Sequence, residues 1–306
     1  MDIFTDPQEL TGFVWRIKRN YHLKLWEETR AKPGYIPLVG FVPTMGALHE
    51  GHMSLVRKSV EENHFTVVSI FVNPLQFGPS EDLGKYPRPF EKDKAMLEEA
   101  GVDALLAPDA AKFYPDGFQT RVAVAEVTKG YCGERRPGHF DGVTTVVAKL
   151  FGIVMPDRAY FGEKDYQQLQ AVKRMVQDLS FPLQIVAMPT VRETDGLACS
   201  SRNRYLSDVE RNAAPGLFAS LVKLKKEFLN GIADAHRLVQ IGMSEMMRLM
   251  GFVDGFGIEY LEIADPETLK RREMDAEPGD VALAAVHFGS TRLIDNIRLS
   301  ESETAS

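Results

Sequence analysis

Cysteine is scarce in this chain of 306 residues, where only Cys132 and Cys199 occur. Their spacing fits no metal-binding motif, so we expect two free thiols in a reducing compartment. Long apolar runs are also lacking, and none reaches the length that crosses a bilayer. The opening residues MDIFTD carry acids where a signal peptide has basic residues before an apolar run. These absences predict a cytoplasmic protein with no membrane partner.

Positive charge is in deficit, with 36 Lys and Arg against 43 Asp and Glu and a net charge of −7. This balance argues against a general nucleic-acid partner, although it permits local basic pockets. Two nucleotide-binding fingerprints are missing as well. No Gly-x-Gly-x-x-Gly follows an expected strand, and Gly78 to Lys85 has neither the spacing of a P-loop nor Ser or Thr after its lysine. If phosphates are bound, another motif must hold them.

The most informative stretch that is present is PTMGALHEGH, residues 43–52. A short apolar strand, residues 38–42, leads into it, and an amphipathic helical pattern begins at Met53. A strand that enters a helix through a glycine-bearing loop places backbone N–H groups and the positive helix end at one point, which suits an anion. His49 and His52 add side chains that can donate hydrogen bonds to an oxyanion. Phosphate chemistry is therefore the first hypothesis.

The two histidines permit other interpretations. The zincin motif places its histidines four residues apart on a helix. Here the spacing is three, with Gly51 between them, which argues against zinc. Both histidines could instead cap the helix, and their spacing alone leaves that alternative open.

Strand and helix patterns alternate from the histidine motif to about residue 188. Apolar strand patterns lie at residues 65–72, 102–107, 121–127, 158–161 and 183–188, with helical patterns at residues 90–100, 143–154 and 166–179. This alternation predicts an α/β fold with a Rossmann-like, doubly wound parallel sheet. Two long helical patterns at residues 207–229 and 233–249, then strands at 257–263, 281–288 and 291–294, predict a smaller α+β domain. We expect domains at residues 1–189 and 190–306.

Three further polar groups can contribute to a phosphate or substrate site. Gly162-Glu163-Lys164-Asp165 supplies a lysine for phosphate oxygens and carboxylates that can approach magnesium. Ser200-Ser201-Arg202 supplies hydroxyls and a guanidinium, and Gln76 and Gln168 are neutral hydrogen bonders. Taken alone, each is a common feature of polar turns and loops.

Taken in order, these segments resemble the pantothenate synthetase (pantoate–β-alanine ligase) family, within the adenylyl-transferring enzymes that share a His-x-Gly-His motif. The matching segments are PTMGALHEGH (43–52), SIFVNPLQF (69–77), YPR (86–88), RPGHF (136–140), FGEKDYQQL (161–169), VRE (191–193), residues 195–206 and TRLIDN (291–296). The resemblance implies ATP- and magnesium-dependent ligation of pantoate and β-alanine through a pantoyl-adenylate, with AMP and pyrophosphate released. It also implies a cytoplasmic homodimer, an ATP- and pantoate-binding first domain and a C-terminal lid.

The resemblance also implies a set of site residues. The catalytic charge stabilisers would be His49, His52, Lys164 and Arg202. ATP would contact Met45, Gly46, Ala47, Leu48, His49, Glu50, Gly51, His52, Gly162, Glu163, Lys164, Asp165, Val191, Cys199, Ser200, Ser201 and Arg202. Pantoate would contact Gln76 and Gln168, with Gln76 also near β-alanine, and the pocket would include Pro43, Thr44, Asn73, Tyr86, Arg136 and His139. Magnesium would be bound by Asp93.

The chain departs from the family pattern at three places. The segment before Leu38 is longer, Cys199 stands where relatives have Met or Leu, and Lys92 replaces an acid beside Asp93. Two alternative functions stay open: a nucleotidyltransferase of the same superfamily and a non-catalytic nucleotide-binding protein. The first alternative does not explain Gln76 and Gln168.

Overall fold

The computed structural model describes residues 1–29, 39–78, 83–84 and 86–300. The described chain forms two compact units. The first comprises Met1–Gly162 and Ala171–Met188, and the second comprises Glu163–Gln170 and the residues from Pro189 onward. The longer segment that the sequence shows before Leu38 falls in residues 30–38, outside the described residues.

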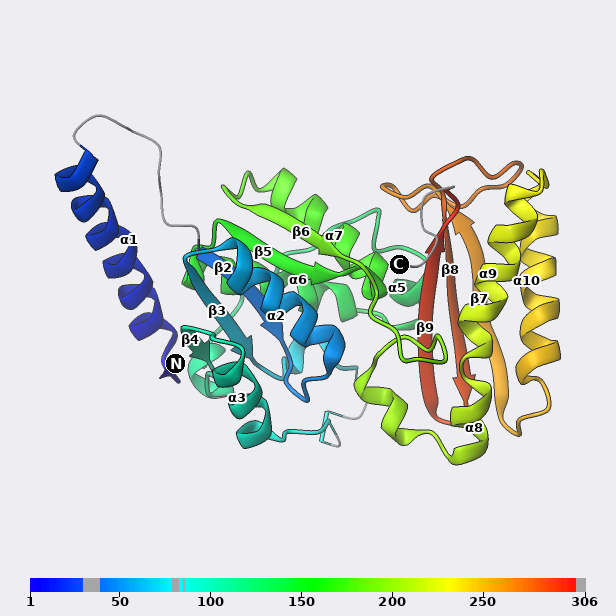
Figure 1. Ribbon diagram of the computed structural model, residues 1–306, viewed down its shortest axis with the longest axis horizontal. Coiled ribbons are helices and arrows are strands. Elements are labelled where there is room, and N and C mark those ends of the chain that lie inside the picture. Colours follow the sequence, from blue (N-terminus) through cyan, green and yellow to red (C-terminus); the bar gives the residue numbers. More distant parts are fainter. Residues whose placement is uncertain (30–38, 79–82, 85, 301–306) are drawn as a thin grey trace. The chain divides into compact units, whose positions relative to one another are not determined.

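A six-stranded sheet forms the centre of the first unit (Figure 1). Every pairing in it is parallel, and the strand order is β1-β4-β3-β2-β5-β6. The strands are β1 (Asp2–Phe4), β2 (Val39–Thr44), β3 (Phe65–Ile70), β4 (Ala104–Leu106), β5 (Arg158–Gly162) and β6 (Gln184–Met188). From β2 the chain winds outward through β3 to β4 and later returns to β5 on the other side of β2. The predicted doubly wound sheet is confirmed, and its switch point lies between β2 and β5, where open α/β sheets bind their ligands.

The helices of the first unit connect the parallel strands. They are α1 (Pro7–Thr29), α2 (Glu50–Glu62), α3 (Phe90–Glu99), α4 (Ala110–Phe113), α5 (Tyr131–Arg135), α6 (His139–Val154) and most of α7 (Tyr166–Asp178), with the short 3-10 turn η1 (Pro74–Gln76). A second 3-10 turn, η2 (Glu163–Asp165), precedes α7. The interior strand β2 is almost wholly buried, as expected where helices cover both faces of a parallel sheet. The first residues of α7 and η2 belong to the second unit.

The strand predicted at residues 121–127 is wrong, because this segment forms no regular element. The N–H of Val122 donates to the hydroxyl of Thr145 at 2.9 Å, and the hydroxyl of Thr144 donates to the Val122 carbonyl at 2.5 Å. Side chains of α6 thus supply the hydrogen bonds that a neighbouring strand would have supplied.

The second unit contains a three-stranded antiparallel sheet in the order β7-β8-β9. Its elements are η3 (Ser201–Tyr205), α8 (Asp208–Ala213), α9 (Gly216–Leu229), α10 (Ala235–Met250), β7 (Phe256–Ala264), β8 (Val281–Phe288) and β9 (Thr291–Arg298). The sequence predicts one helix over residues 207–229, but Pro215 separates α8 from α9. Proline has no N–H for the helical ladder and disfavours the helical conformation of the residue before it.

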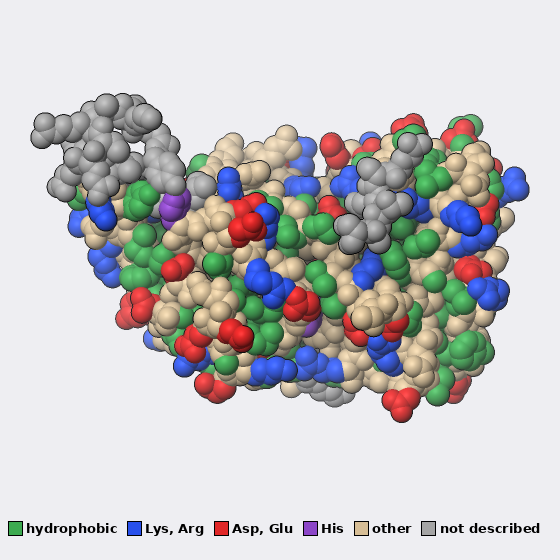
Figure 2. All heavy atoms as spheres, viewed as in Figure 1, with side chains coloured by type: hydrophobic (Ala, Val, Ile, Leu, Met, Phe, Trp, Pro, Cys, Tyr) green, Lys and Arg blue, Asp and Glu red, His purple; other side chains and the backbone are tan. Residues whose placement is uncertain are grey.

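The described surface is chemically mixed. Figure 2 shows acidic and basic side chains interspersed over the visible face. Among the described residues, no helix combines the length and apolarity needed to span a membrane.

Candidate active site

The histidine motif lies at the carboxyl end of β2, beside the switch point of the sheet. His49 is the N-cap of α2, and its Nδ1 accepts a hydrogen bond from the Gly51 N–H at 3.2 Å. An imidazole that accepts at Nδ1 carries its neutral-state proton on Nε2, which can then donate. The His52 ring lies 4.0 Å from the His49 ring, centroid to centroid. His49 therefore caps the helix, the alternative left open by the spacing, and also keeps a donor nitrogen.

Asp93 of α3 holds the turn before these histidines. Its Oδ2 accepts from the Ala47 N–H at 2.7 Å, and its Oδ1 accepts from the Leu48 N–H at 2.9 Å. Gly46 and Ala47 have φ values of +81° and +52°, a conformation that costs energy for a residue other than glycine. Because Asp93 is only 1% exposed, its carboxylate fixes this unusual backbone from inside the protein.

The contacts of Asp93 give it a role that the sequence does not suggest. Both carboxylate oxygens accept from backbone amides, so the predicted magnesium ligation gains no support from its geometry. The described residues also contain no cluster of three or more His, Cys, Asp or Glu side chains that could hold a metal ion. The amides of Ala47 and Leu48, candidates for binding phosphate, are directed at Asp93 instead. The imidazoles are thus better placed than these two amides to act on an anion.

A buried network of polar side chains follows β3 in the first unit. Asn73 donates through Nδ2 to Gln76 Oε1 at 3.1 Å and to the Gly142 carbonyl at 3.0 Å. Gln76 in turn donates through Nε2 to the sulfur of Met45 at 3.2 Å. A Cβ at Gly142 would lie 2.3 Å from the Leu75 carbonyl oxygen, so only glycine allows α6 to approach η1 this closely. The network joins Gln76, predicted to contact pantoate, and the predicted pocket residue Asn73 to Met45. Met45 is the first residue of the turn between β2 and α2, residues 45–49, which we call the histidine turn.

Arg136 and His139 extend the same network. His139 Nδ1 lies 2.8 Å from the Gln76 carbonyl oxygen, and its Nε2 lies 2.9 Å from Arg136 NH1. Since a guanidinium only donates, Nε2 must accept and Nδ1 must carry the proton. A neutral His139 therefore orients both the η1 backbone and the Arg136 guanidinium.

Tyr114 belongs to this network and was not predicted from the sequence. Its hydroxyl donates to Asn73 Oδ1 at 2.9 Å, and burial raises the pKa of the phenol above its ordinary value. It stays protonated at neutral pH and remains a donor. Tyr86, which was predicted, packs edge-on against Phe77 with ring centroids 6.2 Å apart.

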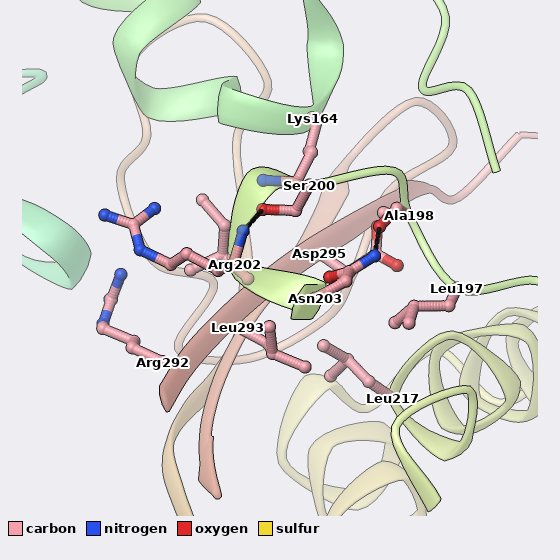
Figure 3. Close-up of a pocket in the computed structure, with 11 residues that line it drawn as sticks. Lys164, Leu197, Ala198, Ser200, Arg202, Asn203, Leu217, Arg292, Leu293 and Asp295 are labelled. Atoms are coloured by element: carbon pink, nitrogen blue, oxygen red, sulfur yellow. Dashed lines mark hydrogen bonds between the residues drawn. The ribbon is translucent and has the colours of Figure 1, made fainter. Parts of the chain in front are cut away.

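Three of the predicted phosphate residues, all in the second unit, line one pocket (Figure 3). Lys164, Ser200 and Arg202 contribute to it together with Arg292 and Asp295 of β9. Ser200 is the N-cap of η3, and its Oγ accepts from the Arg202 N–H at 3.3 Å. The structure therefore brings a lysine, a hydroxyl and an arginine from two predicted motifs into one place, a set of groups suited to an anionic ligand.

The comparison with known proteins decides the family. Residues 17–298 match the family described as pantoate-beta-alanine ligase. The chain belongs to the pantoate–β-alanine ligase family.

Relatives of this family agree with the match over most of the chain. A pantothenate synthetase from Sulfurihydrogenibium sp. is 54% identical over 263 residues, which is 85% of this chain and 91% of that protein. The crystal structure of pantothenate synthetase from Thermus thermophilus has a TM-score of 0.85 at 46% identity, covering 98% of this chain and 100% of that chain. A pantoate–β-alanine ligase from Francisella tularensis, solved with β-γ ATP and β-alanine, has a TM-score of 0.72 at 31% identity and covers 98% of both chains.

The remaining predicted residues of the ligase site fall in both units. In the first unit, β2 ends with Pro43 and Thr44, and β5 ends with Gly162. Helix α2 begins with Glu50 and Gly51, and the Glu50 carboxylate contacts Arg57.

In the second unit the Cys199 N–H donates to the Val191 carbonyl at 2.9 Å. Ser201 begins η3, Glu163 and Asp165 flank Lys164 in η2, and Gln168 lies in the first turns of α7. Gln76 and Gln168 belong to different units, and their joint contact with pantoate stays a prediction.

The role of Asp93 is testable against the magnesium hypothesis. Asp93→Asn keeps one acceptor oxygen but turns an NH2 group toward a backbone N–H, so we expect a loss of about 1–3 kcal/mol in unfolding free energy and lower turnover. Denaturant unfolding and turnover at increasing Mg²⁺ check this, with the exposed Glu91→Gln of the same helix as control. Recovery of activity at high Mg²⁺ with unchanged stability would instead support metal ligation.

Proposed function

We propose that this chain joins (R)-pantoate to β-alanine to form pantothenate, using ATP and releasing AMP and pyrophosphate through a pantoyl-adenylate. The observation that carries the proposal is the network of Asn73, Gln76, His139 and Arg136, which continues through Met45 into the histidine turn. Family membership over residues 17–298 supports the same reaction. A nucleotidyltransferase of the same superfamily would have no evident use for this network.

In the first step the pantoate carboxylate attacks the α-phosphorus of ATP. Its oxygen forms the new P–O bond while the bond to the β-phosphate oxygen breaks and pyrophosphate leaves. No general base is needed, because such a carboxylic acid has a pKa of roughly 4 and is ionised at neutral pH. The work of the protein is to hold two anions together and to stabilise the charge that develops on the phosphate oxygens. We assign that role to His49 and His52 in the first unit and to Lys164 and Arg202 in the second.

In the second step the amine of β-alanine attacks the carbonyl carbon of the pantoyl-adenylate. β-Alanine attacks as the free amine. The new C–N bond replaces the C–O bond to AMP, which leaves with the bonding electron pair, and the proton lost from the nitrogen passes to water. Gln76 and Gln168 would hold the hydroxyl groups of pantoate, and Gln76 would also lie near β-alanine. A C-terminal unit that acts as a lid, with the domains divided near residue 189, would keep water from the mixed anhydride.

Magnesium, the homodimer and the cytoplasmic location also belong to this proposal. Magnesium retains part of its water shell and is commonly held by a few carboxylates together with substrate phosphates. We therefore expect it to arrive on ATP and to neutralise phosphate charge there. Size-exclusion chromatography with light scattering would test the dimer.

One assay separates the proposed ligase from both alternatives. The protein is incubated with ATP, Mg²⁺, pantoate and β-alanine, each omitted in turn, and AMP, pyrophosphate and pantothenate are followed. We expect AMP and pantothenate in equal amounts, dependent on all three substrates. Nucleotide retained in the product would indicate the nucleotidyltransferase, and ATP binding without AMP would indicate a non-catalytic protein.

The part played by Tyr114 can be tested within the same assay. Tyr114→Phe removes the hydrogen bond to Asn73. A bond of this kind contributes about 1 kcal/mol. We expect the KM for pantoate to rise roughly five-fold, while the KM for ATP stays constant. An unchanged KM for pantoate would show that Asn73 keeps its orientation without the tyrosine.

A further inference from the structure

Arg292 is a third cation in the pocket of the second unit, in addition to Lys164 and Arg202. It lies near the start of β9 and lines the same pocket as these two residues and Ser200. Figure 3 shows the side chains of Arg202 and Arg292 extending toward the same side of this pocket. Arginine suits phosphate recognition, because its planar guanidinium can donate two parallel hydrogen bonds to phosphate oxygens.

The orientation of Arg292 is fixed by Glu259. The guanidinium donates through Nε to Glu259 Oε2 at 2.7 Å and through NH2 to Oε1 at 3.1 Å. Glu259 sits at an irregularity of β7, where the register with β8 shifts between Ile258 and Tyr260. A bulge of this kind redirects a side chain out of the regular alternation of a strand.

His287 of β8 completes the support of this arginine. It is the direct cross-strand neighbour of Arg292, and its Nε2 lies 2.7 Å from Glu259 Oε2. Burial alone would raise the pKa of the Glu259 carboxyl, but hydrogen bonds and charge from Arg292 and His287 hold that pKa below its ordinary value. Glu259 therefore stays ionised at neutral pH and keeps one edge of the guanidinium in place. A carboxylate that accepts from both Nε and NH2 fixes the plane of the guanidinium.

The charges around the pocket favour a ligand with several negative charges. The acid that lines the pocket, Asp295, is paired with Arg192 by contacts of 2.6 and 2.9 Å. Among the described residues that line the pocket, the cations Lys164, Arg202 and Arg292 outnumber the acid Asp295. Asp165, which does not line it, lies 3.9 Å from the Lys164 ammonium. The β- and γ-phosphates of ATP together carry more negative charge than a single phosphate and therefore suit such a cluster.

We propose that Arg292 binds the β- and γ-phosphates of ATP and the pyrophosphate formed from them, and that Glu259 is its positioning residue. This inference rests on the proposed ATP-dependent function. It adds a residue of β9 to the proposed phosphate-binding residues Lys164, Ser200 and Arg202.

Ligand binding and kinetics of full-length variants test the inference. For Arg292→Gln we expect the KM for ATP and the Kd for inorganic pyrophosphate to rise about 10- to 100-fold, the effect of losing a charge-assisted contact. The Kd for AMP and the KM for β-alanine should stay constant, because neither ligand carries these phosphates. Arg292→Lys should recover part of the loss, and Glu259→Gln should give a smaller loss in the same direction. Arg248→Gln, which removes an exposed arginine of α10, is the charge-matched control and should behave as wild type.

Each outcome decides a separate point. Unchanged ATP and pyrophosphate constants in Arg292→Gln would overturn the inference. Equal weakening of AMP and pyrophosphate would overturn the assignment to the β- and γ-phosphates. Since pyrophosphate binding is measured by calorimetry without turnover, it tests Arg292 even if the wild type makes no pantothenate, a result that would count against the proposed function alone.

Discussion

His52→Ala is expected to lower kcat by about 10²- to 10³-fold, the usual cost of removing one donor that stabilises an oxyanion. The imidazole lies in the first turn of α2, with its ring 4.0 Å from that of His49. Charge develops on the phosphate oxygens as the carboxylate attacks, so the loss should appear in kcat more than in the KM for ATP. Steady-state kinetics of the full reaction measure it. The exposed His236→Ala on α10 is the control, and turnover near the wild-type value in His52→Ala would refute the electrostatic role.

His49 requires a different pair of variants, because it also caps the helix. His49→Ala removes both the cap and the imidazole, whereas His49→Asn keeps a side chain that is among the preferred N-caps. If the imidazole acts on phosphate, both variants lose turnover and only alanine lowers the thermal midpoint. If capping is its whole contribution, asparagine restores turnover as well as stability. The comparison separates two roles that the spacing of the histidines could not distinguish.

The strands and the loops at their ends could be predicted from local patterns. The run at residues 65–72 is rich in β-branched and aromatic residues, as expected for a central parallel strand that is buried on both faces, and the structure forms β3 there, over Phe65–Ile70. The placement of the histidine turn and of Gly162 at strand ends follows from the same alternation. In contrast, the alternating pattern of residues 121–127 was misleading, because hydroxyls on α6 supply the hydrogen bonds of Val122.

The residues that hold the site in shape could not be found this way. Asp93 lies 46 residues from Ala47, and Tyr114 lies 41 residues from Asn73. Glu259 of β7 and Arg292 of β9 are 33 residues apart in the sequence, and their side chains meet across the intervening strand β8. The local sequence around one residue of such a pair does not identify the other residue. These contacts can therefore be seen only in the folded structure.

Asp295→Asn is expected to cause the largest loss of stability in the second unit. The Asp295 carboxylate, 1% exposed, accepts two hydrogen bonds from Arg192, whose guanidinium lies 3.3 Å from the centroid of the Phe218 ring. Asparagine leaves this arginine charge without its counter-ion, and breaking a buried pair in this way costs about 3–5 kcal/mol. The loss of stability is measured by denaturant unfolding, as a lower midpoint for the transition of the second unit.

The same substitution should also weaken ATP binding, because Asp295 lines the pocket with Lys164 and Arg202. The Glu245→Gln variant is the matched control, since Glu245 forms a similar two-contact pair with Arg248 on the exposed face of α10. An exposed pair of this kind contributes little, so its midpoint and its KM for ATP should remain near wild type. If Asp295→Asn changed the midpoint and the KM for ATP no more than Glu245→Gln does, the pair of Asp295 and Arg192 would not support the pocket. A drop in stability with normal ATP binding would instead confine its role to folding of the second unit.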